Sequence, residues 1–361
     1  MIILSPIPHF IKLNTMRFYY YLLLTVFSTP AIAWDMVCDN TLTCRVIEYS
    51  DMSDTGLIKS SILFERKAGA NQPVEIYVRT KNSEEDIEIK DTQQLDNSLA
   101  LFINQEYFGE LKEIRNNIYQ LSQHQATKVI QAFTKNEKVI FRNNRSQSSY
   151  TNGGFYDVML TMDKKQGRVG TTGAVIAHGN KNESNVYAPI PVPTIKKGKV
   201  IDPEQSQELN TNEVIKIFPQ FKKRYIHEAK CDAYDLEDPY YDETQGYDKR
   251  FRLIKLDNNH DLLETWCWFS AYNSGNAYWI ISNTVKPSNK NIKFINNEGN
   301  TYKNGTISSI AKLRGEGDCL EKSSWTWNGH KFMLSSNIST GECLGFDGGA
   351  WELPSFISKI K

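Results

Sequence analysis

Near its C-terminus the chain reads Trp325-Thr-Trp-Asn-Gly-His-Lys-Phe332, and this stretch predicts a β-hairpin. Asn-Gly between two apolar runs is typical of a type I′ turn, whose twist matches that of two antiparallel strands. A two-residue loop would place Trp327 opposite His330 and Trp325 opposite Phe332, with all four rings on one side of the ribbon. We therefore expect antiparallel β structure in this part of the chain.

The β pattern extends through most of the sequence. Residues 74–79 alternate apolar and polar side chains, as a half-buried strand does. Further short β-type runs, bounded by polar turns, cover residues 62–64, 99–103, 139–141, 251–256, 262–269, 277–282 and 292–295. Ser122 and Gln125 form a capping box before a helical apolar pattern, and residues 211–218 read as a shorter helix. The predicted fold is mainly β: two antiparallel β-sandwich-like domains, each with a minor helix, stapled by disulfides.

Composition divides the chain into four segments. Residues 1–33 read as a signal peptide, with an apolar stretch after Arg17 and a cleavage sequence that ends between Ala33 and Trp34. The leader lacks the length of a membrane span, and Met16 is a candidate for the true start. Residues 34–186 are expected to form an N-terminal β domain with one helix, and residues 187–205 a proline-rich, extended linker. Residues 206–361 then form a tryptophan-rich C-terminal β domain.

The six cysteines are expected to form disulfides, because export carries them into an oxidising compartment. Sequence alone allows many pairings. The sequential one, Cys38–Cys44, Cys231–Cys267 and Cys319–Cys343, keeps each bridge within one domain. The sequence contains neither a C-x-x-C motif nor zinc-ligand spacing. We therefore expect structural bridges, no metal site and no cofactor.

Charge limits the classes of partner. The chain has 42 basic and 42 acidic residues and no basic block, which argues against a nucleic-acid partner. No run after the leader has the length of a membrane helix, so stable membrane insertion is not predicted. The acidic segment 232–248 reads as a solvated loop and not as a calcium site, because the calcium-loop pattern is absent. The sequence predicts a periplasmic or secreted protein whose partner is an envelope protein or a glycan.

Several motifs follow one another in a fixed order. They include Trp34-Asp-Met-Val-Cys38, Met162-Asp-Lys-Lys-Gln-Gly-Arg-Val-Gly-Thr-Thr-Gly-Ala174 and residues 267–273, 314–319, 327–332, 343–349 and 351–354. Together they resemble the secreted bacterial family grouped as domain of unknown function 1176. The first half is also distantly similar to the invasion-associated locus B proteins, which share a Trp-x-x-x-Cys opening and export. The chain departs from the first family at Thr172, where proline is expected, and at Leu320, where glycine is expected. The resemblance implies export, disulfides and β architecture, and brings no established activity.

Candidate binding residues concentrate in the second half. They are Tyr272, Asn273, Arg314, Asp318, Trp325, Trp327 and Trp351. Exposed tryptophans form stacking platforms or protein anchors, whereas buried ones form the core of a small β domain, and we expect the core role for most of them. The charged pair in Arg314-Gly-Glu-Gly-Asp318 either fixes its own loop or recognises a partner. The glycines beside Arg168 read as a set of turns and not as a phosphate cradle, because their spacing fits no phosphate-binding motif.

No catalytic residue is assigned. The sequence contains neither a G-x-S-x-G elbow nor an H-E-x-x-H motif. A non-catalytic binding module of the cell envelope is therefore the favoured interpretation. The alternative is an envelope hydrolase with two convergent carboxylates in an interdomain cleft, one of them with a raised pKa.

Overall fold

A computed structural model describes residues 34–50, 59–81, 98–144, 146–202, 204–231, 251–283 and 291–361. All of them belong to one compact unit that spans Ala33–Lys361. The predicted signal peptide and the acidic segment 232–248 lie outside the described residues.

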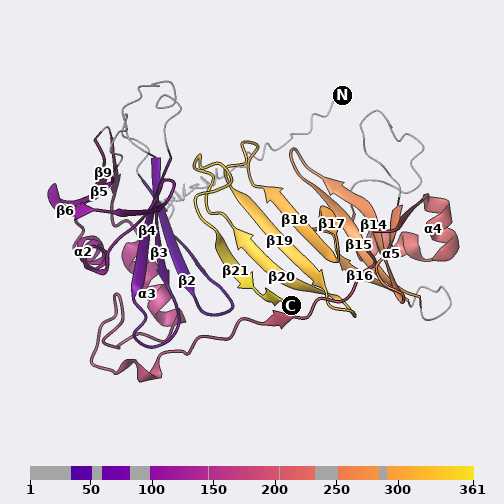
Figure 1. Cartoon of the computed structure of the whole chain (residues 1–361), viewed down its shortest axis with the longest axis horizontal. Coiled ribbons are helices and arrows are strands. Elements are labelled where there is room, and N and C mark those ends of the chain that lie inside the picture. Colours follow the sequence, from indigo (N-terminus) through magenta and orange to yellow (C-terminus); the bar gives the residue numbers. More distant parts are fainter. Residues whose placement is uncertain are drawn as a thin grey trace, which may run out of the picture. The chain divides into compact units, whose positions relative to one another are not determined.

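Two antiparallel sheets make up the first half (Figure 1). The larger has the order β1-β2-β3-β4-β8-β7. Its strands are β1 (Asp35–Cys38), β2 (Cys44–Tyr49), β3 (Lys59–Arg66), β4 (Val74–Lys81), β7 (Lys112–Arg115) and β8 (Ile118–Gln120). The smaller sheet, ordered β10-β9-β5-β6, contains β5 (Ala100–Ile103), β6 (Glu106–Glu110), β9 (Val139–Arg142) and β10 (Gln147–Tyr150). Burial alternates along β4, which confirms the strand predicted from its pattern.

Two α-helices complete this core. In α2 (Gln123–Thr134) the predicted capping box is present, with Ser122 as N-cap. Helix α3 (Phe155–Lys165) was not predicted, because it starts at Gly154, which has a φ of 87° and no side chain for a cap. Trp34 lies at the centre, with ring centroids 5.3 Å from Phe133 of α2 and 5.1 Å from Phe155 of α3. A 3₁₀ turn, η1 (Glu183–Asn185), follows later in the chain.

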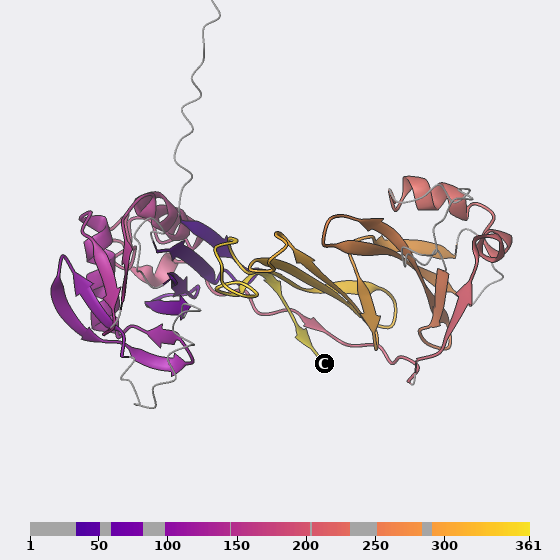
Figure 2. The ribbon, with the colours of Figure 1, turned by 90° about the horizontal axis from the view of Figure 1, so that it is seen from above.

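The second half begins with a five-stranded antiparallel sheet and two helices. The strands, in sheet order, are β12 (Ser206–Leu209), β13 (Phe251–Lys255), β14 (His260–Phe269), β15 (Ser274–Ser282) and β16 (Ile292–Asn296). Helices α4 (Thr211–Ile217) and α5 (Phe221–His227) cover one face of this sheet (Figure 2). Phe221 of α5 contacts Trp279 of β15 with ring centroids 4.9 Å apart. Helix α4 confirms the shorter predicted helix, and Asn210 is its N-cap.

A second five-stranded antiparallel sheet follows. It contains β17 (Thr301–Lys303), β18 (Thr306–Lys312), β19 (Leu320–Trp327), β20 (Phe332–Ser339) and β21 (Leu353–Ile357). A short parallel pair joins β11 (Thr194–Ile195) to β22 (Lys359–Ile360). The mainly β, antiparallel fold is therefore confirmed.

The predicted hairpin exists, but its predicted turn and register are wrong. Trp327 pairs with Phe332, which leaves four residues, Asn328 to Lys331, in the loop. The Asn328 side chain accepts hydrogen bonds from the backbone N–H groups of His330 and Lys331, both at 2.9 Å. This local capping favours a longer loop over the two-residue turn. The same longer loop places Trp325 opposite Leu334 and not Phe332, and a bulge between Ser324 and Trp325 then pairs Ser324 with Ser336.

Three disulfides join Cys38 to Cys44, Cys231 to Cys267 and Cys319 to Cys343. This is the sequential pairing that the sequence favoured. Among the described residues, no helix is long and apolar enough to cross a membrane.

Candidate functional site

Two loops of the second half are joined by one asparagine. Asn273, between β14 and β15, donates a hydrogen bond from Nδ2 to the carbonyl of Lys312 at 2.7 Å. Its Oδ1 accepts a hydrogen bond from the Lys312 backbone N–H at 2.8 Å. Because β14 and β18 belong to different sheets, this amide clamps the ends of two sheets together.

Large apolar side chains are exposed around this clamp. Tyr272, Ile310 and Leu313 are 54%, 55% and 53% exposed. Gly315 allows the Tyr272 ring to lie close to the second loop, because a Cβ at Gly315 would be 3.2 Å from the ring. We call Tyr272, Asn273, Ile310, Leu313 and Arg314 the loop surface.

Arg314 and Asp318 form an ion pair within the second loop. The guanidinium contacts both carboxylate oxygens of Asp318, with Nε 3.2 Å from Oδ1, and it also lies 3.1 Å from Glu316. Asp318 is buried and accepts a hydrogen bond from the Gly345 N–H at 2.6 Å. Burial opposes ionisation, but the hydrogen bonds from Gly345 and Arg314 outweigh it, so the pKa of Asp318 is lowered. Asp318 therefore anchors the loop from inside, while Arg314 stays partly exposed.

The three tryptophans proposed for binding lie elsewhere. Trp327 is completely buried and its ring contacts Phe332 and His260. Trp325 is half-buried against a cluster of buried aliphatic and aromatic side chains. Trp351 is 9% exposed, and its indole N–H donates to Ser61 Oγ at 2.9 Å. The structure thus brings Tyr272, Asn273, Arg314 and Asp318 together and leaves the tryptophans in packing roles.

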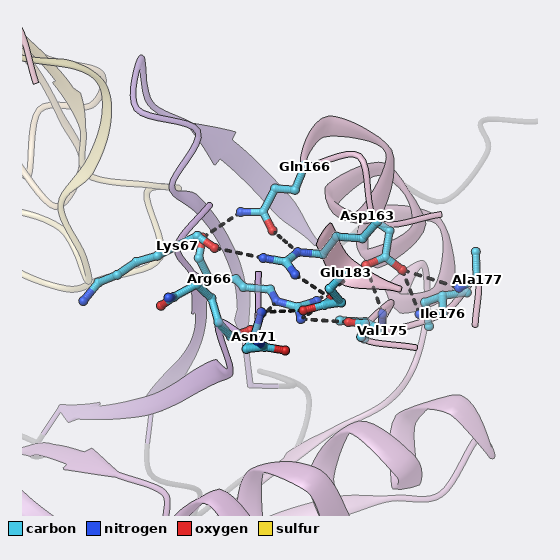
Figure 3. A network of polar contacts seen from close by, with 12 residues as sticks. Arg66, Lys67, Asn71, Asp163, Gln166, Val175, Ile176, Ala177 and Glu183 are labelled. Atoms are coloured by element: carbon cyan, nitrogen blue, oxygen red, sulfur yellow. Dashed lines mark hydrogen bonds and ion pairs between the residues drawn. The ribbon is translucent and has the colours of Figure 1, made fainter. Parts of the chain in front are cut away.

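A buried ionic network holds the segment that follows α3 (Figure 3). Arg168 is fully buried and donates to Gln166 Oε1 at 2.9 Å and to Glu183 Oε1 at 2.8 Å. Its remaining nitrogen donates to the carbonyls of Lys67 and Gly69, at 3.2 and 2.6 Å. All three nitrogens of this guanidinium therefore donate hydrogen bonds inside the fold.

Asp163 and Arg66 extend the same network. Asp163 accepts hydrogen bonds from the backbone N–H groups of Val175 and Ile176, both at 2.9 Å. Arg66 donates to the carbonyl of Gly173 at 2.7 Å. Burial and the neighbouring Arg168 lower the pKa of Arg66 to about 10, although Asp163 and Glu183 oppose this shift.

Gly173 is required by packing, because a Cβ there would lie 1.8 Å from Glu183 Oε1. The network fixes turns by internal hydrogen bonds, in line with the structural interpretation of these glycines.

Glu48 of β2 is a carboxyl group that sequence reasoning missed. It is 8% exposed, Oε1 accepts the Tyr49 N–H at 3.1 Å, and Oε2 has no hydrogen-bond partner among the described residues. Burial, assisted by Glu342 and Asp35, raises its pKa to about 8. An acid in the apolar run Val46-Ile-Glu-Tyr49 was the available signal.

Glu48 and Asp35 lie on opposite faces of the sheet. Asp35 pairs with Ile47 across the sheet, so it shares the face opposite to that of Glu48. The backbone carbonyl of Glu342 accepts the Tyr49 hydroxyl, which lies on the Ile47 face. Burial and the nearby Asp35 raise the pKa of Glu342.

Asp318, Cys319 and Cys343 place potential metal-ligand atoms close together. The two sulfur atoms are bonded to each other, so neither is available as a thiolate ligand.

Comparison with known protein families gives a match over most of the chain. The model of a family described as "Protein of unknown function (DUF1176)" matches residues 32–358. No curated protein and no solved structure gives a significant match.

Proposed function

We propose that this chain, which belongs to the DUF1176 family of proteins of unknown function, is an exported, non-catalytic binding protein of the cell envelope. Its leader sequence and three disulfides support a periplasmic or secreted location. The similarity of its first half to the invasion-associated locus B proteins remains a prediction, based on the Trp34-to-Cys38 opening.

The loop surface is the part of the molecule that we propose binds the partner. The observation that carries this proposal is the exposure of Tyr272 and Leu313 on two loops that the Asn273 amide holds together. Aromatic side chains and arginine supply much of the binding energy at protein interfaces, especially on preorganised surfaces. Arg314 adds a partly exposed cation beside these apolar side chains.

A protein partner fits this surface better than a glycan. Ile310 and Leu313 are aliphatic and offer sugar hydroxyl groups no hydrogen bond. Both polar atoms of the Asn273 amide are already bonded to Lys312. The loop surface can therefore contact a partner mainly through its apolar side chains and through the guanidinium of Arg314.

Site-specific photo-crosslinking in intact cells tests the proposal. Tyr272 is replaced by p-benzoylphenylalanine, and the matched control is Tyr156 of α3, which is 59% exposed. We expect an adduct of discrete mass from position 272, none from position 156, and loss of the adduct when Leu313→Asp is added. Equal crosslinking at both positions, or an adduct that is insensitive to Leu313→Asp, would contradict a specific protein interface here.

A further inference from the structure

A pocket of about 290 Å³ lies in the first half of the chain, between strands β6, β7 and β8 and the start of α2. It is far in sequence from the loop surface and plays no part in the proposed protein interface. Its lining residues are Phe108, Glu110, Lys112, Gln120, Leu121, Ser122, His124 and Gln125. The volume lies at the lower end of ligand pockets, which range over roughly 300–1,000 Å³, and so suits a small ligand.

Gln125 fixes one wall of this pocket. Its Nε2 donates to the carbonyls of Phe108 and Glu110, both at 3.1 Å. Its Oε1 accepts a hydrogen bond from the Ser122 N–H at 2.9 Å. Because Gln125 is buried, these bonds tie β6 rigidly to the beginning of α2. The pocket is therefore preformed, with an apolar surface contributed by Phe108 and Leu121.

Three ionisable side chains at the rim are free to bind a ligand. Glu110, Lys112 and His124 are exposed, and within the described part of the chain they make no side-chain hydrogen bond or ion pair. Gln120 makes one long contact, from Nε2 to the Tyr77 hydroxyl at 3.5 Å. The pocket thus offers a carboxylate acceptor beside ammonium, amide and imidazole groups.

We propose that this pocket binds one sugar ring of an uncharged glycan. A hydroxyl group both donates and accepts, so neighbouring hydroxyls can donate to Glu110 and accept from Lys112. Phe108 supplies an apolar surface for the C–H face of the ring. An anion would meet repulsion from Glu110, and a cation repulsion from Lys112. A neutral polyhydroxylated ring satisfies both charged groups.

Titration of the ¹⁵N/¹³C-labelled mature chain, followed by NMR, tests this proposal. The probes are glucose, galactose, N-acetylglucosamine and N,N′-diacetylchitobiose at millimolar concentrations. We expect at least one of them to shift the His124 ring resonances and to leave those of His178, outside the pocket, unchanged. Absence of a His124 shift with all four sugars would overturn the proposal. A shift with the zwitterion alanylalanine and none with the sugars would assign the pocket to a peptide and overturn it equally.

Variants give the second readout. Glu110→Gln and Lys112→Met should each weaken sugar binding roughly tenfold, because the first removes the charge from a hydrogen-bond acceptor and the second removes a charged donor. Lys135→Met, at the opposite end of the same helix, is the matched control and should bind like the wild type. All three positions are exposed, so the folded spectrum should be retained. Unchanged affinity in both pocket variants would refute the site, whatever becomes of the proposed protein interface.

Discussion

At the scale of single residues, Glu48 shows how strongly a core can change the chemistry of a carboxyl group. The alternation of β2 directs Glu48 to the same side as Cys44 and Val46, into the core of the first half. An ionised carboxylate there would lose its hydration, and in the described part of the chain the Tyr49 N–H is its one hydrogen-bond donor. The folded protein therefore keeps the Glu48 proton at neutral pH.

Replacing Glu48 by glutamine should stabilise the protein at alkaline pH. Glutamate in the unfolded chain ionises near pH 4.5, whereas Glu48 in the fold has a pKa of about 8. Between these values the folded state binds the extra proton, so the free energy of unfolding falls as pH rises through this window. Glu48→Gln should remove that slope and exceed the wild type by about 2–4 kcal/mol at pH 8. Urea unfolding at pH 5, 6, 7 and 8 measures it.

The exposed Glu342 provides the control for this series. Glu342→Gln should retain most of the pH dependence of the wild type, since the main cause of the Glu48 shift is burial. Parallel stability–pH curves for the wild type and Glu48→Gln would show that another group is responsible.

Replacement of Arg168 should lower the stability of the protein strongly. Arg168→Met removes the nearest cationic partner of Glu183 and the donor to the carbonyls of Lys67 and Gly69. Breaking a buried pair from one side costs about 3–5 kcal/mol. Equilibrium urea unfolding should show this loss, while Lys164→Met, an exposed change on α3, should stay close to the wild type. A loss below about 1 kcal/mol in Arg168→Met would contradict a stabilising role for the network.

At the scale of elements, helices and strands whose caps and apolar pattern lie within one short stretch of sequence were predictable. Features that depend on contacts between distant residues were not. The cap and periodicity of α2 lie within one short stretch, so the sequence displays them directly. Helix α3 has no side-chain cap, and its buried Asp163 interrupts the apolar pattern. The hairpin loop was mistaken because the Asn328 side chain captures two N–H groups that a type I′ turn would use differently.

The candidate site was only partly predictable, because it depends on contacts between residues that are far apart in the sequence. The motif residues Tyr272, Asn273 and Arg314 were identified, but the bond between Asn273 and Lys312 joins two sheets and has no sequence signature. Leu313, Ile310 and the pocket beside α2 depend on which side chains the tertiary structure leaves exposed.

The C-terminal segment, defined as residues 341–352, packs as an element on the first-half sheet. Phe346 and Trp351 cluster with Ile47, Tyr49 and Leu63. Arg79 donates to the carbonyls of residues 349 and 350, at 2.9 and 2.6 Å. The segment therefore covers an apolar face that would otherwise meet water.

Comparison of Trp351→Ala with Tyr272→Ala should distinguish a residue that stabilises the fold from one that binds the partner. Loss of a large buried ring and of its hydrogen bond to Ser61 should cost about 3–5 kcal/mol. Tyr272→Ala, at an exposed position, should change stability by less than about 0.5 kcal/mol while it weakens partner binding. Calorimetry of both variants measures the two effects. Similar losses in both would place Tyr272 in the structural framework and remove it from the loop surface.

At the scale of the whole molecule, the two predicted domains share more than a linker. We retain residues 34–186 and 206–361 as the proposed domains. Asn40, in the first, exchanges two hydrogen bonds with Ile357 of β21, at 3.1 and 2.8 Å. The C-terminal segment adds an apolar contact between the same two parts. Stability of the first domain should therefore depend on residues near the end of the chain.

The Cys319–Cys343 bridge is the place to test that dependence. Cys343 lies near the start of the C-terminal segment, and Asp318, next to Cys319, accepts a hydrogen bond from the Gly345 N–H within that segment. Cys319→Ser with Cys343→Ser opens a loop with a sequence separation of 24, against 6 for Cys38–Cys44. By the loop-entropy model, removal of the Cys319–Cys343 bridge should lower the free energy of unfolding by about 3.5 kcal/mol, and removal of the Cys38–Cys44 bridge by about 2.4 kcal/mol.

The Cys319→Ser, Cys343→Ser variant is compared with the Cys38→Ser, Cys44→Ser variant by limited proteolysis followed by mass spectrometry. The Cys319–Cys343 bridge holds the start of the C-terminal segment in place. Without it the segment should open locally, so the Cys319→Ser, Cys343→Ser variant should be cut by protease within residues 341–352. Its first-half sheet should then lose protection in hydrogen exchange at β2 and β3, which the segment covers. The Cys38→Ser, Cys44→Ser variant should lose stability without that cleavage. If β2 and β3 stayed protected after the segment was cut, the two domains would be energetically independent, and the contacts between them would contribute little to the fold.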